Sequence, residues 1–391
     1  MSRIAIVVHA VYPGDPRIRR QADALTDAGH QVDVFALRAP DEAPEESIGP
    51  LRVIRLPVNR GFTSFAGHMA EYLAFAGMAT WRLTREHRRR RYQLVQVATV
   101  PDFLAFAAAP IKLAGVPLLL DLHEDMPELF RDRFAHPLLR PLMPLVTGST
   151  RAAAAMADEL ITVHEPLRQL SIERGVPPDK ISVVMNSADA RVFDPARHPR
   201  RQFMEDGELR LIHHSALQRI YGLEVAVEAV AMIDPADIPL RLDVYGDGPH
   251  AAQVAATVER TGTADRVHLH GRVALEQLPE LLAGADIGLV PSLPEPYLQY
   301  SLSTKLLEYA AMGVPTIASD LATFRSHFND EAIRYVPGGD PGALAAAIRE
   351  LASDPAGAAR LGAEAHRQAA GYAWSLQAEH YLAIVERLAA P

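Results

Sequence analysis

The sequence predicts an α/β protein made of two doubly wound domains in tandem. The chain has 391 residues, which is more than one hydrophobic core usually supports. Short runs rich in β-branched residues alternate with amphipathic segments, and this alternation is typical of parallel sheets covered by helices on both faces. A polar segment without an apolar period, residues 196–208, separates the first series from the second and is interpreted as a linker.

The first series predicts a domain over residues 1–195. Strands are expected in "RIAIVVHA", "QVDVFAL", "LRVIRLPV", "QLVQVAT", "VPLLLDLHE" and "DELITVHE". Helices are expected in "IRRQADALTDAGH", which ends at a capping glycine, and in "PDFLAFAAAPIKLAG".

The second series predicts a domain over residues 209–372. Its expected strands include "LRLIHHSAL", "LRLDVYGDG", "VHLHGRV", "IGLVPS" and "AIRYVPGG". Residues 373–391 form an amphipathic segment that can pack back as a helix onto the first domain. Doubly wound sheets bind ligands at the carboxyl ends of their strands, so a two-domain version is expected to bind its ligand in the cleft between domains.

Composition narrows the class of protein. A formal net charge of −9 argues against a nucleic-acid partner held by general electrostatic attraction. The absence of cysteine excludes disulfides and thiolate metal sites. The first apolar run leads directly into "PGDPRIRR", which resembles neither a signal-peptide cleavage region nor a membrane stop, so we expect a cytoplasmic protein.

One expected helix, in "SFAGHMAEYLAFAGMATWRLTREHRRRRY", combines apolar residues with the basic run from Arg88 to Arg91. Such a run is compatible with a solvated helix end. It is also compatible with peripheral contact to an anionic membrane, which would place the protein at the inner face of that membrane.

The turn "VYGDGP" carries Gly246 and Gly248 after a strand. It lacks the third glycine of a dinucleotide fingerprint, so an NAD site is not expected. The glycines serve either a tight strand-to-helix turn or the close approach of a ligand to the backbone.

A second polar cluster, "DLHEDMPE", follows an apolar strand with His123 at its centre. It lacks further nitrogen ligands for a transition metal, so no metal site is expected. Hydrogen bonds to a polyhydroxylated ligand are the favoured interpretation, and ion pairs with Arg131 and Arg133 are the alternative.

The stretch "SLSTKLLEYAAMGVPTIASD" places polar residues at the start of an otherwise apolar helix. Ser301, Ser303 and Thr304 can cap that helix. Lys305 lies at the end of the helix where a cation is unfavourable, which indicates a bound anion such as a phosphate. Glu308, one turn on, can bond ribose hydroxyls or pair with Lys305.

Taken together, these segments resemble a GT-B-fold glycosyltransferase, similar to the retaining family 4 enzymes. The resemblance covers nearly the whole chain and rests on the order of "DPRIRRQADALTDAGHQVDV", "VPDFLAFAA", "DLHEDMPE", "ADELITVHEP", "ISVVMNSAD", "YGLEVAVEAV", "VYGDGP", "VHLHGRV", "LLAGADIGLVPS" and "STKLLEYAAMGVPTIASD". It implies two Rossmann-like domains that face each other across a cleft.

The resemblance implies that the second domain binds a nucleotide sugar. Glu308 would hold the ribose, the helix start would hold the diphosphate, and the backbone after "HG" would read the base edge. The donor-binding residues implied are Glu308, Ser303, Thr304, Ser215, Gly246, Arg272 and Val273.

The first domain would serve the acceptor. His123 would face the donor sugar, and the "PGDPR" loop would border the acceptor pocket. The acceptor-side residues implied are Asp15, Arg17, Glu124, Asp125 and Glu128.

The chain departs from the family pattern at its charged positions. The glutamate that normally contacts the donor sugar is replaced by Tyr300, and the phosphate-clamp arginine and lysine fall on Ala216 and Tyr221. Arg219 and Lys305 are the expected substitutes for the two missing cations. The expected catalytic residues are therefore His123, Arg219 and Lys305.

The function expected is retaining transfer of a sugar from a nucleoside diphosphate sugar, with UDP as the expected nucleotide and no metal or other cofactor. The acceptor is a saccharide, a lipid-linked glycan or a natural product. One alternative is a sugar-nucleotide epimerase of the same fold, which would use the carboxylates and histidine of "DLHEDMPE" as acids and bases. Another is a two-domain sugar-binding protein without catalytic activity.

Overall fold

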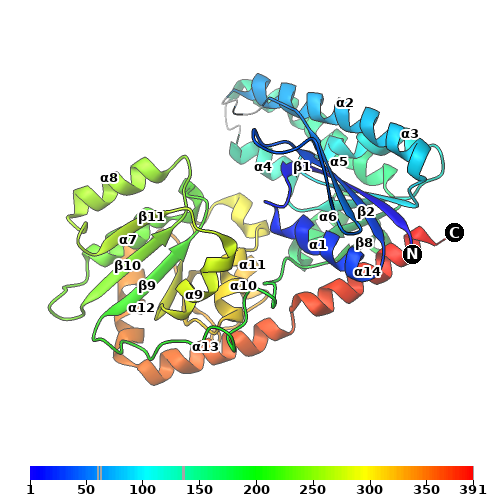
Figure 1. The fold of residues 1–391 in the computed structure, drawn as a ribbon. Helices are drawn as coiled ribbons and strands as arrows, with labels where there is room; N and C mark the ends of the chain where they lie inside the picture. The colour runs from blue at the N-terminus through cyan, green and yellow to red at the C-terminus, as the bar shows by residue number, and fades with distance from the viewer. Residues whose placement is uncertain (60, 62–63, 134–136, 391) are drawn as a thin grey trace. The chain divides into compact units, whose positions relative to one another are not determined.

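The computed structural model describes residues 1–59, 61, 64–133 and 137–390, and the chain divides into two compact units (Figure 1). Unit 1 comprises Met1–Asn186 with Ser375–Pro391, and unit 2 comprises Ser187–Trp374. The change of unit thus precedes the boundary expected after residue 195. The expected linker is packed on unit 2, because Arg200 donates to the carbonyl of Ala285 at 2.8 Å and Phe203 packs against the unit 2 core.

Unit 1 is an eight-stranded sheet of order β3-β4-β2-β1-β5-β6-β7-β8. Its strands are β1 (Arg3–Val11), β2 (Gln31–Leu37), β3 (Glu45–Ile48), β4 (Leu51–Leu56), β5 (Leu94–Ala98), β6 (Leu118–Leu122), β7 (Glu159–Thr162) and β8 (Ile181–Val183). Its helices are α1 (Pro16–Asp27), α2 (Phe65–Arg90), α3 (Ala109–Lys112), α4 (Met126–Arg133), α5 (Met143–Met156), α6 (Glu165–Glu173) and α14 (Trp374–Ala389).

Two features of unit 1 differ from the sequence-based expectation. The edge strand β3 pairs antiparallel with β4 and was not expected, because its exposed polar residues give no apolar pattern. Ion pairs from Glu45 and Glu46 to Arg52 and Arg55 hold it in place. Residues 102–108 form a 3₁₀ helix that passes into the short α3, instead of one continuous helix.

Helices cover both faces of the unit 1 sheet (Figure 1). On one face, Phe75 and Leu83 of α2 pack with Val95 and Val97 of β5. On the other face, α1 and α14 contribute side chains that bond to β5 and β6, as when Tyr381 of α14 bonds to Gln96. The last helix of the chain is therefore a structural part of unit 1.

Unit 2 is a six-stranded sheet of order β11-β10-β9-β12-β13-β14, and its strand pairs are parallel. Its strands are β9 (Leu209–His214), β10 (Leu240–Tyr245), β11 (Val267–Gly271), β12 (Ile287–Val290), β13 (Thr316–Ser319) and β14 (Arg334–Val336). Its helices are α7 (Leu223–Ala231), α8 (Ala251–Thr261), α9 (Leu278–Ala283), α10 (Thr304–Ala311), α11 (Ala322–Arg325), α12 (Pro341–Ser353) and α13 (Pro355–Ala370).

The strand order of unit 2 reverses between β9 and β12. From β9 the chain proceeds outward through β10 and β11, then returns to β12 on the other side of β9 and proceeds outward again. The segments that follow β9 and β12 therefore diverge at the carboxyl edge of the sheet, which is where doubly wound sheets bind ligands. The second of these segments leads into α10.

The described part of the chain contains no helix that is both long and apolar enough to span a membrane.

Gly288 of β12 allows α10 to pack tightly on the sheet. A Cβ atom at this position would lie 2.5 Å from a ring carbon of the fully buried Tyr309 on α10. We expect Gly288→Ala to displace the ring and to lower the free energy of unfolding of unit 2 by about 1–3 kcal/mol. Thermal and urea unfolding measure the effect.

Gly77→Ala is the matched control, because a Cβ at this exposed position of α2 meets no atom within 4 Å. It should leave stability unchanged or raise it by up to about 1 kcal/mol, since alanine favours a helix over glycine. A Gly288→Ala protein as stable as the wild type would contradict the packing of α10 on β12.

Candidate functional site

Lys305 is a buried cation at the start of α10. Its side chain lies over the ring of Tyr221, with the Nζ atom 4.1 Å from the ring centroid, and the residue is only 6% exposed. Burial lowers the pKa of Lys305 to about 8, although the neighbouring Glu308 carboxylate opposes the shift. Within the described ranges, no carboxylate lies within ion-pair distance of its Nζ. This environment is suited to an anionic ligand.

Glu308 lies one turn further along α10 and bonds to a histidine that the sequence analysis did not single out. Its Oε2 atom lies 2.6 Å from Nε2 of His214, at the end of β9. The His214 ring packs edge-on against Tyr309. The pair is largely buried, so the carboxylate is held in one orientation at the reversal point of the sheet.

Ser215, one of the expected donor-binding residues, bonds to a buried histidine through its hydroxyl. His213 is fully buried, its Nδ1 lies 2.9 Å from the carbonyl of Leu289, and its Nε2 lies 2.9 Å from Oγ of Ser215. Burial, with a smaller effect of the Lys305 charge, lowers the pKa of His213 well below its usual value. The neutral ring donates to the carbonyl and accepts from Ser215, so the serine hydroxyl proton is already engaged.

Gly246 serves the packing of two loops. A Cβ here would lie 1.8 Å from the carbonyl oxygen of Ser215, and its φ of 137° is rarely adopted by other residues. The space left by the missing side chain is thus filled by the neighbouring loop and is not free for a ligand. Gly248 is similar, with a Cβ position 2.4 Å from the carbonyl oxygen of Leu217.

Ser303 occupies the N-cap position of α10, but its side chain makes no capping bond, contrary to expectation. Its Oγ atom is buried and has no hydrogen-bond partner among the described residues. Thr304 follows as the first helical residue. The first turn of α10 therefore has no side-chain cap from Ser303.

Arg219 lies in the 3₁₀ turn before α7 and is paired with Glu295. The guanidinium lies 2.7 Å from Oε1 of Glu295, and the arginine side chain is 55% exposed. Glu295, five residues before Tyr300 in the chain, is thus a neighbour of Arg219. Tyr300, which stands where the family has its glutamate, ends the 3₁₀ helix Pro296–Tyr300 that precedes α10.

Arg272 and Val273 follow β11 at the same edge of the sheet. The backbone N–H of Gly246 donates to the carbonyl of Gly271 at 2.7 Å, which ties this segment to the glycine turn after β10. The Arg272 side chain is 79% exposed, with Asp247 at 3.9 Å. The structure thus brings Arg272, Val273 and Gly246 together at the strand ends.

In unit 1, His123 follows β6 and is 5% exposed. Its Nε2 lies 2.7 Å from Oδ2 of the buried Asp121, and its backbone N–H donates to Thr99. Its Nδ1 atom is buried and lacks a hydrogen-bond partner in the part of the chain that is described. The imidazole therefore has one nitrogen available for a ligand.

Asp15 and Arg17 form a pair after β1, which neighbours β5 in the sheet. Asp15 accepts from the backbone N–H of Arg17 at 2.9 Å as the N-cap of α1, and it also accepts from the guanidinium. Burial alone would raise the pKa of Asp15, but the charge and hydrogen bonds of Arg17 outweigh it and hold the pKa well below its usual range. The pair is therefore ionised.

Asp125 and Glu128, both expected at the acceptor side, are engaged in structural contacts. Asp125 accepts from the backbone N–H of Glu128 at 2.9 Å, and both carboxylates pair with Arg174 at the end of α6. Glu128 also pairs with Arg131. The ion-pair interpretation therefore holds for these two residues, with Arg174 as a partner that the sequence analysis did not name.

Glu124 differs from these two carboxylates. Over the described ranges its carboxylate forms no ion pair at contact distance, although its charge is close enough to help raise the pKa of Arg17. No three histidine, aspartate or glutamate side chains in the described part converge in a way that could hold a metal ion.

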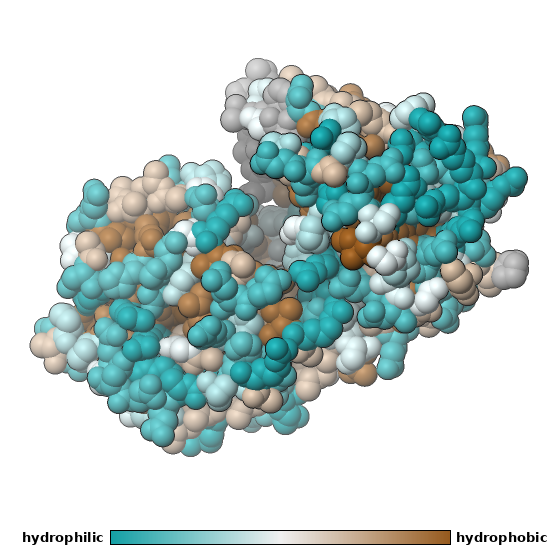
Figure 2. Space-filling model, viewed as in Figure 1, coloured by the Kyte–Doolittle hydropathy of each residue, from teal (hydrophilic) through white to brown (hydrophobic). Residues whose placement is uncertain are grey.

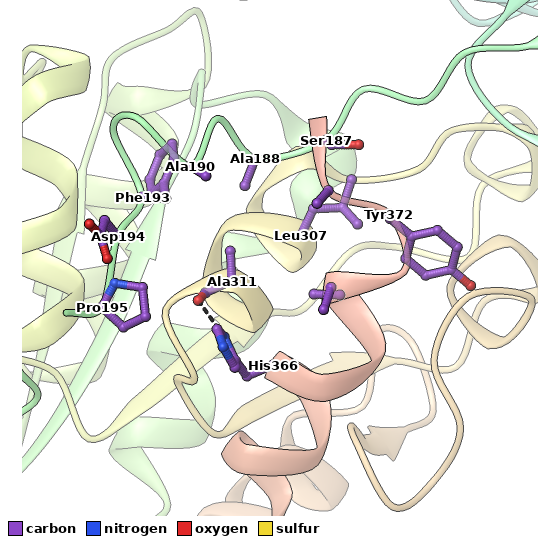
Figure 3. Close-up of a pocket in the computed structure, with 13 residues that line it drawn as sticks. Ser187, Ala188, Ala190, Phe193, Asp194, Pro195, Leu307, Ala311, His366 and Tyr372 are labelled. Carbon is purple, nitrogen blue, oxygen red and sulfur yellow. Dashed lines mark hydrogen bonds between the residues drawn. The ribbon is translucent and has the colours of Figure 1, made fainter. Parts of the chain in front are cut away.

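A separate pocket of about 380 Å³ lies on another side of α10 (Figure 3). Leu307 and Ala311 of α10 line it together with Phe193 and Tyr372, and His366 bonds to the carbonyl of Ala311. Its lining is mainly apolar and includes neither Lys305 nor Glu308. This pocket is therefore distinct from the polar site at the start of α10.

Comparisons with known proteins match each half of the chain to a protein family. Residues 14–187 match the family described as glycosyl transferase 4-like domain, and residues 208–354 match the family described as glycosyl transferases group 1. A 2-deoxystreptamine glucosyltransferase from Streptomyces kanamyceticus is 25% identical over 327 residues, which cover 78% of this chain and 74% of that protein.

Solved structures share the fold over almost the full length. Sucrose-phosphate synthase from Thermosynechococcus elongatus is similar with a TM-score of 0.80 at 20% identity, and the match covers 99% of each chain. Anabaena HepE, in complex with UDP and glucose, is similar with a TM-score of 0.71 at 15% identity, covering 99% of this chain and 100% of that one. The two-domain α/β architecture predicted from the sequence is confirmed, and the chain belongs to the group 1 glycosyltransferases of GT-B fold.

Proposed function

We propose that this glycosyltransferase uses a nucleoside diphosphate sugar, with UDP as the nucleotide, and transfers the sugar with retention of configuration. The observation that carries the proposal is the arrangement at the start of α10. A buried cation and a fixed carboxylate lie one helical turn apart, Lys305 over Tyr221 and Glu308 against His214. A cation suits a phosphate, and a carboxylate suits the two hydroxyls of a ribose.

The main chemical requirement is stabilisation of the departing diphosphate. Lys305 supplies a charge in a water-poor setting, where electrostatic stabilisation is strong. The start of α10 adds backbone N–H groups and the positive end of the helix dipole. Arg219 would supply a second charge by exchanging its partner Glu295 for a phosphate oxygen. Because these groups provide positive charge without a metal ion, we propose that the reaction is metal-independent.

Glu308 would accept hydrogen bonds from the ribose hydroxyls, with His214 as the residue that holds its carboxylate. Retention would not need a nucleophilic side chain. The acceptor hydroxyl would attack on the face from which the diphosphate departs, the new glycosidic bond would form as the bond to phosphate breaks, and the proton would pass to a phosphate oxygen. His123 and Glu124 would bind hydroxyls of the sugars.

The named relatives support this choice of donor and reaction. The Streptomyces relative is named as a glucosyltransferase acting on 2-deoxystreptamine, and HepE is described with UDP and glucose. Both descriptions agree with a glucosyl donor, and the name of the Streptomyces relative also agrees with a polyhydroxylated acceptor. They favour transfer over epimerisation.

The reaction is tested with UDP-glucose and an aminocyclitol acceptor, 2-deoxystreptamine. We expect a glycoside with the donor's anomeric configuration, observed by NMR, and unchanged rates in the presence of EDTA. Lys305→Met should lower kcat by about 10²–10³-fold, as expected for loss of one preorganised charge at a leaving group. Lys112→Met, at a surface lysine paired with Asp158, is the control and should keep full activity.

An inverted product would contradict retention. A sugar-nucleotide epimer formed from the donor without acceptor would contradict transfer and support the epimerase alternative.

The lowered pKa of Lys305 predicts a pH dependence of nucleotide affinity. The ligand binds the charged amine, whereas above pH 8 the free protein increasingly carries the neutral form and must take up a proton on binding. Affinity for UDP should therefore fall about tenfold between pH 7 and pH 9. Isothermal titration calorimetry in buffers of different ionisation enthalpy measures both the affinity and the proton uptake.

Lys305→Arg is the control, because arginine stays charged throughout this range. Its affinity for UDP should be nearly constant from pH 7 to pH 9. A wild-type affinity that does not change over the same range would contradict a role for Lys305 in binding the diphosphate.

We also propose peripheral contact with an anionic membrane through α2. The exposed side of this helix is apolar along most of its length and basic at its end, although a solvent-facing helix side is usually polar. Figure 2 shows apolar side chains on the surface along α2. The exposed residues are Ala66, Ala70, Leu73, Ala74, Gly77, Trp81, Arg85, Arg88 and Arg89.

Two further features of α2 support this contact. The acidic residues Glu71 and Glu86 are buried, so no carboxylate of the helix opposes an anionic surface. Trp81 is 60% exposed, with the Arg85 guanidinium 5.4 Å from its ring centroid. An aromatic ring beside a cation is typical of residues at a lipid headgroup interface.

Vesicle sedimentation tests the contact. We expect binding to vesicles containing phosphatidylglycerol and no binding to phosphatidylcholine alone. The chain has two tryptophans, and Trp374 is 9% exposed, so a blue shift of fluorescence on binding would report Trp81. Replacing Arg85, Arg88 and Arg89 by Glu should abolish binding.

The charge-matched control replaces the exposed Arg260, Arg349 and Arg360 of unit 2 by Glu. This variant should still bind, because its altered charges lie outside α2. Equal loss of binding in both variants would reduce the effect to net charge and contradict a specific role of α2.

A further inference from the structure

A chain of buried hydrogen bonds connects His123 to the last helix of the protein. Tyr381 of α14 donates to Oε1 of Gln96 at 2.6 Å, and Nε2 of Gln96 lies 3.2 Å from Oδ2 of Asp121. The same Asp121 oxygen lies 2.7 Å from Nε2 of His123. Gln21 of α1 joins the chain by donating to Asp121 at 2.8 Å.

The register of the sheet explains why these residues meet. β5 and β6 are parallel, with Gln96 opposite Leu119 and Ala98 opposite Asp121. Alternate residues of a strand lie on one face, so Gln96 and Asp121 are diagonal neighbours on the face that α1 and α14 cover. His123 follows two residues after Asp121. Residues that are 260 positions apart in the chain, Asp121 and Tyr381, are thereby joined through one side chain.

The chemistry of Asp121 fixes the direction of every bond in the chain. An ionised carboxylate only accepts, so the amide groups of Gln21 and Gln96 that face it must be their NH₂ groups. The Gln96 carbonyl oxygen then faces Tyr381, which must donate. Burial, with the Asp121 charge as a smaller effect, raises the pKa of Tyr381 well above its usual value, so the hydroxyl keeps its proton.

The same argument sets the state of the imidazole. The His123 nitrogen that faces Asp121 must carry a proton, so in the neutral ring Nε2 is the donor and Nδ1 is an unprotonated acceptor. Nδ1 is the buried nitrogen without a partner in the described ranges. His123 therefore presents an acceptor, which suits a ligand hydroxyl that donates a hydrogen bond.

We propose that Tyr381 is a positioning residue that acts through Gln96 and Asp121 to fix the orientation of the His123 ring. The consequence for the reaction rests on the proposed function, in which His123 accepts a hydrogen bond from a sugar hydroxyl. If the Tyr381 hydroxyl is removed, the Gln96 carbonyl loses its buried donor, while the Gln96 NH₂ group still donates to Oε1 of Gln21 at 2.8 Å and to Asp121, so the amide is free to shift but not to turn. The bond from Gln96 to Asp121 is then less firmly held, and with it the carboxylate that orients the His123 ring.

The test removes the hydroxyl alone, in the full-length protein. Tyr381→Phe keeps the buried ring, and ¹⁵N NMR of histidine-labelled protein reports which ring nitrogen of His123 is protonated, with His123→Gln used for assignment. Tyr335→Phe is the matched control, because its buried hydroxyl donates to the carbonyl of Phe328 at 2.9 Å and has no bond to this chain.

The wild type and Tyr335→Phe should both show the unprotonated Nδ1 and protonated Nε2 of one tautomer. Tyr381→Phe should keep this tautomer, because the Asp121 carboxylate still requires a proton on Nε2, but the ¹⁵N signals of its His123 ring should shift and broaden as the ring is less firmly held. The kcat should fall about tenfold with little change in KM for the nucleotide sugar, as for loss of one buried hydrogen bond. A Tyr381→Phe spectrum identical to that of the wild type would overturn the proposal. Changed His123 ring signals with unchanged kcat would overturn the link to the reaction.

A second variant keeps the proposal testable if Tyr381→Phe does not fold. Gln21→Met removes another donor to Asp121 from α1 and leaves α14 intact, so it should also change the ¹⁵N signals of the His123 ring. The NMR readout does not depend on any donor sugar. If the protein transfers no sugar but Tyr381→Phe still changes the His123 ring signals, the proposed function fails while the positioning network stands.

Discussion

The site in unit 2 depends on the burial of one positive charge. An ammonium group that is withdrawn from water and has no ion pair among the described residues costs free energy, and the cost is expressed as the lowered pKa of Lys305. The face of the Tyr221 ring offsets part of this cost. A bound diphosphate would offset much more. The burial that disfavours the charge in the free protein therefore favours an anion at this position.

The rest of unit 2 keeps that charge where the sheet places ligands. α10 follows β12, next to the central β9, and the missing side chain of Gly288 lets Tyr309 seat the helix closely on the sheet. From β9, His214 reaches across to Glu308. Lys305 and Glu308 are thus one turn apart on a helix that is fixed to β12 through Tyr309 and to β9 through His214. Selective binding of a phosphate and a ribose requires such a rigid helix.

The sequence predicted those parts whose signal is local. Alternating strands and helices predicted the two doubly wound domains, and the polar residues before an apolar segment predicted the helix that begins at Thr304. The anion at Lys305 stays a prediction. Other parts depend on distant contacts. Arg174, which forms ion pairs with Asp125 and Glu128, comes from the end of another helix. The carbonyl of Ser215, which comes from another loop, fills the space beside Gly246. Polar residues inside apolar strands, Gln96 and His214, were a visible signal, but only the fold reveals their partners.

The most direct test compares the affinities of UDP, UMP and 2′,3′-dideoxy-UDP for three proteins: the wild type, Lys305→Met and Glu308→Gln. If Lys305 binds the diphosphate and Glu308 the ribose, Lys305→Met should lose the preference for UDP over UMP and keep the preference for UDP over the dideoxy analogue. Glu308→Gln should show the reverse. Equal loss of both preferences in each variant, or no binding of any of the three nucleotides by the wild type, would contradict α10 as the nucleotide site.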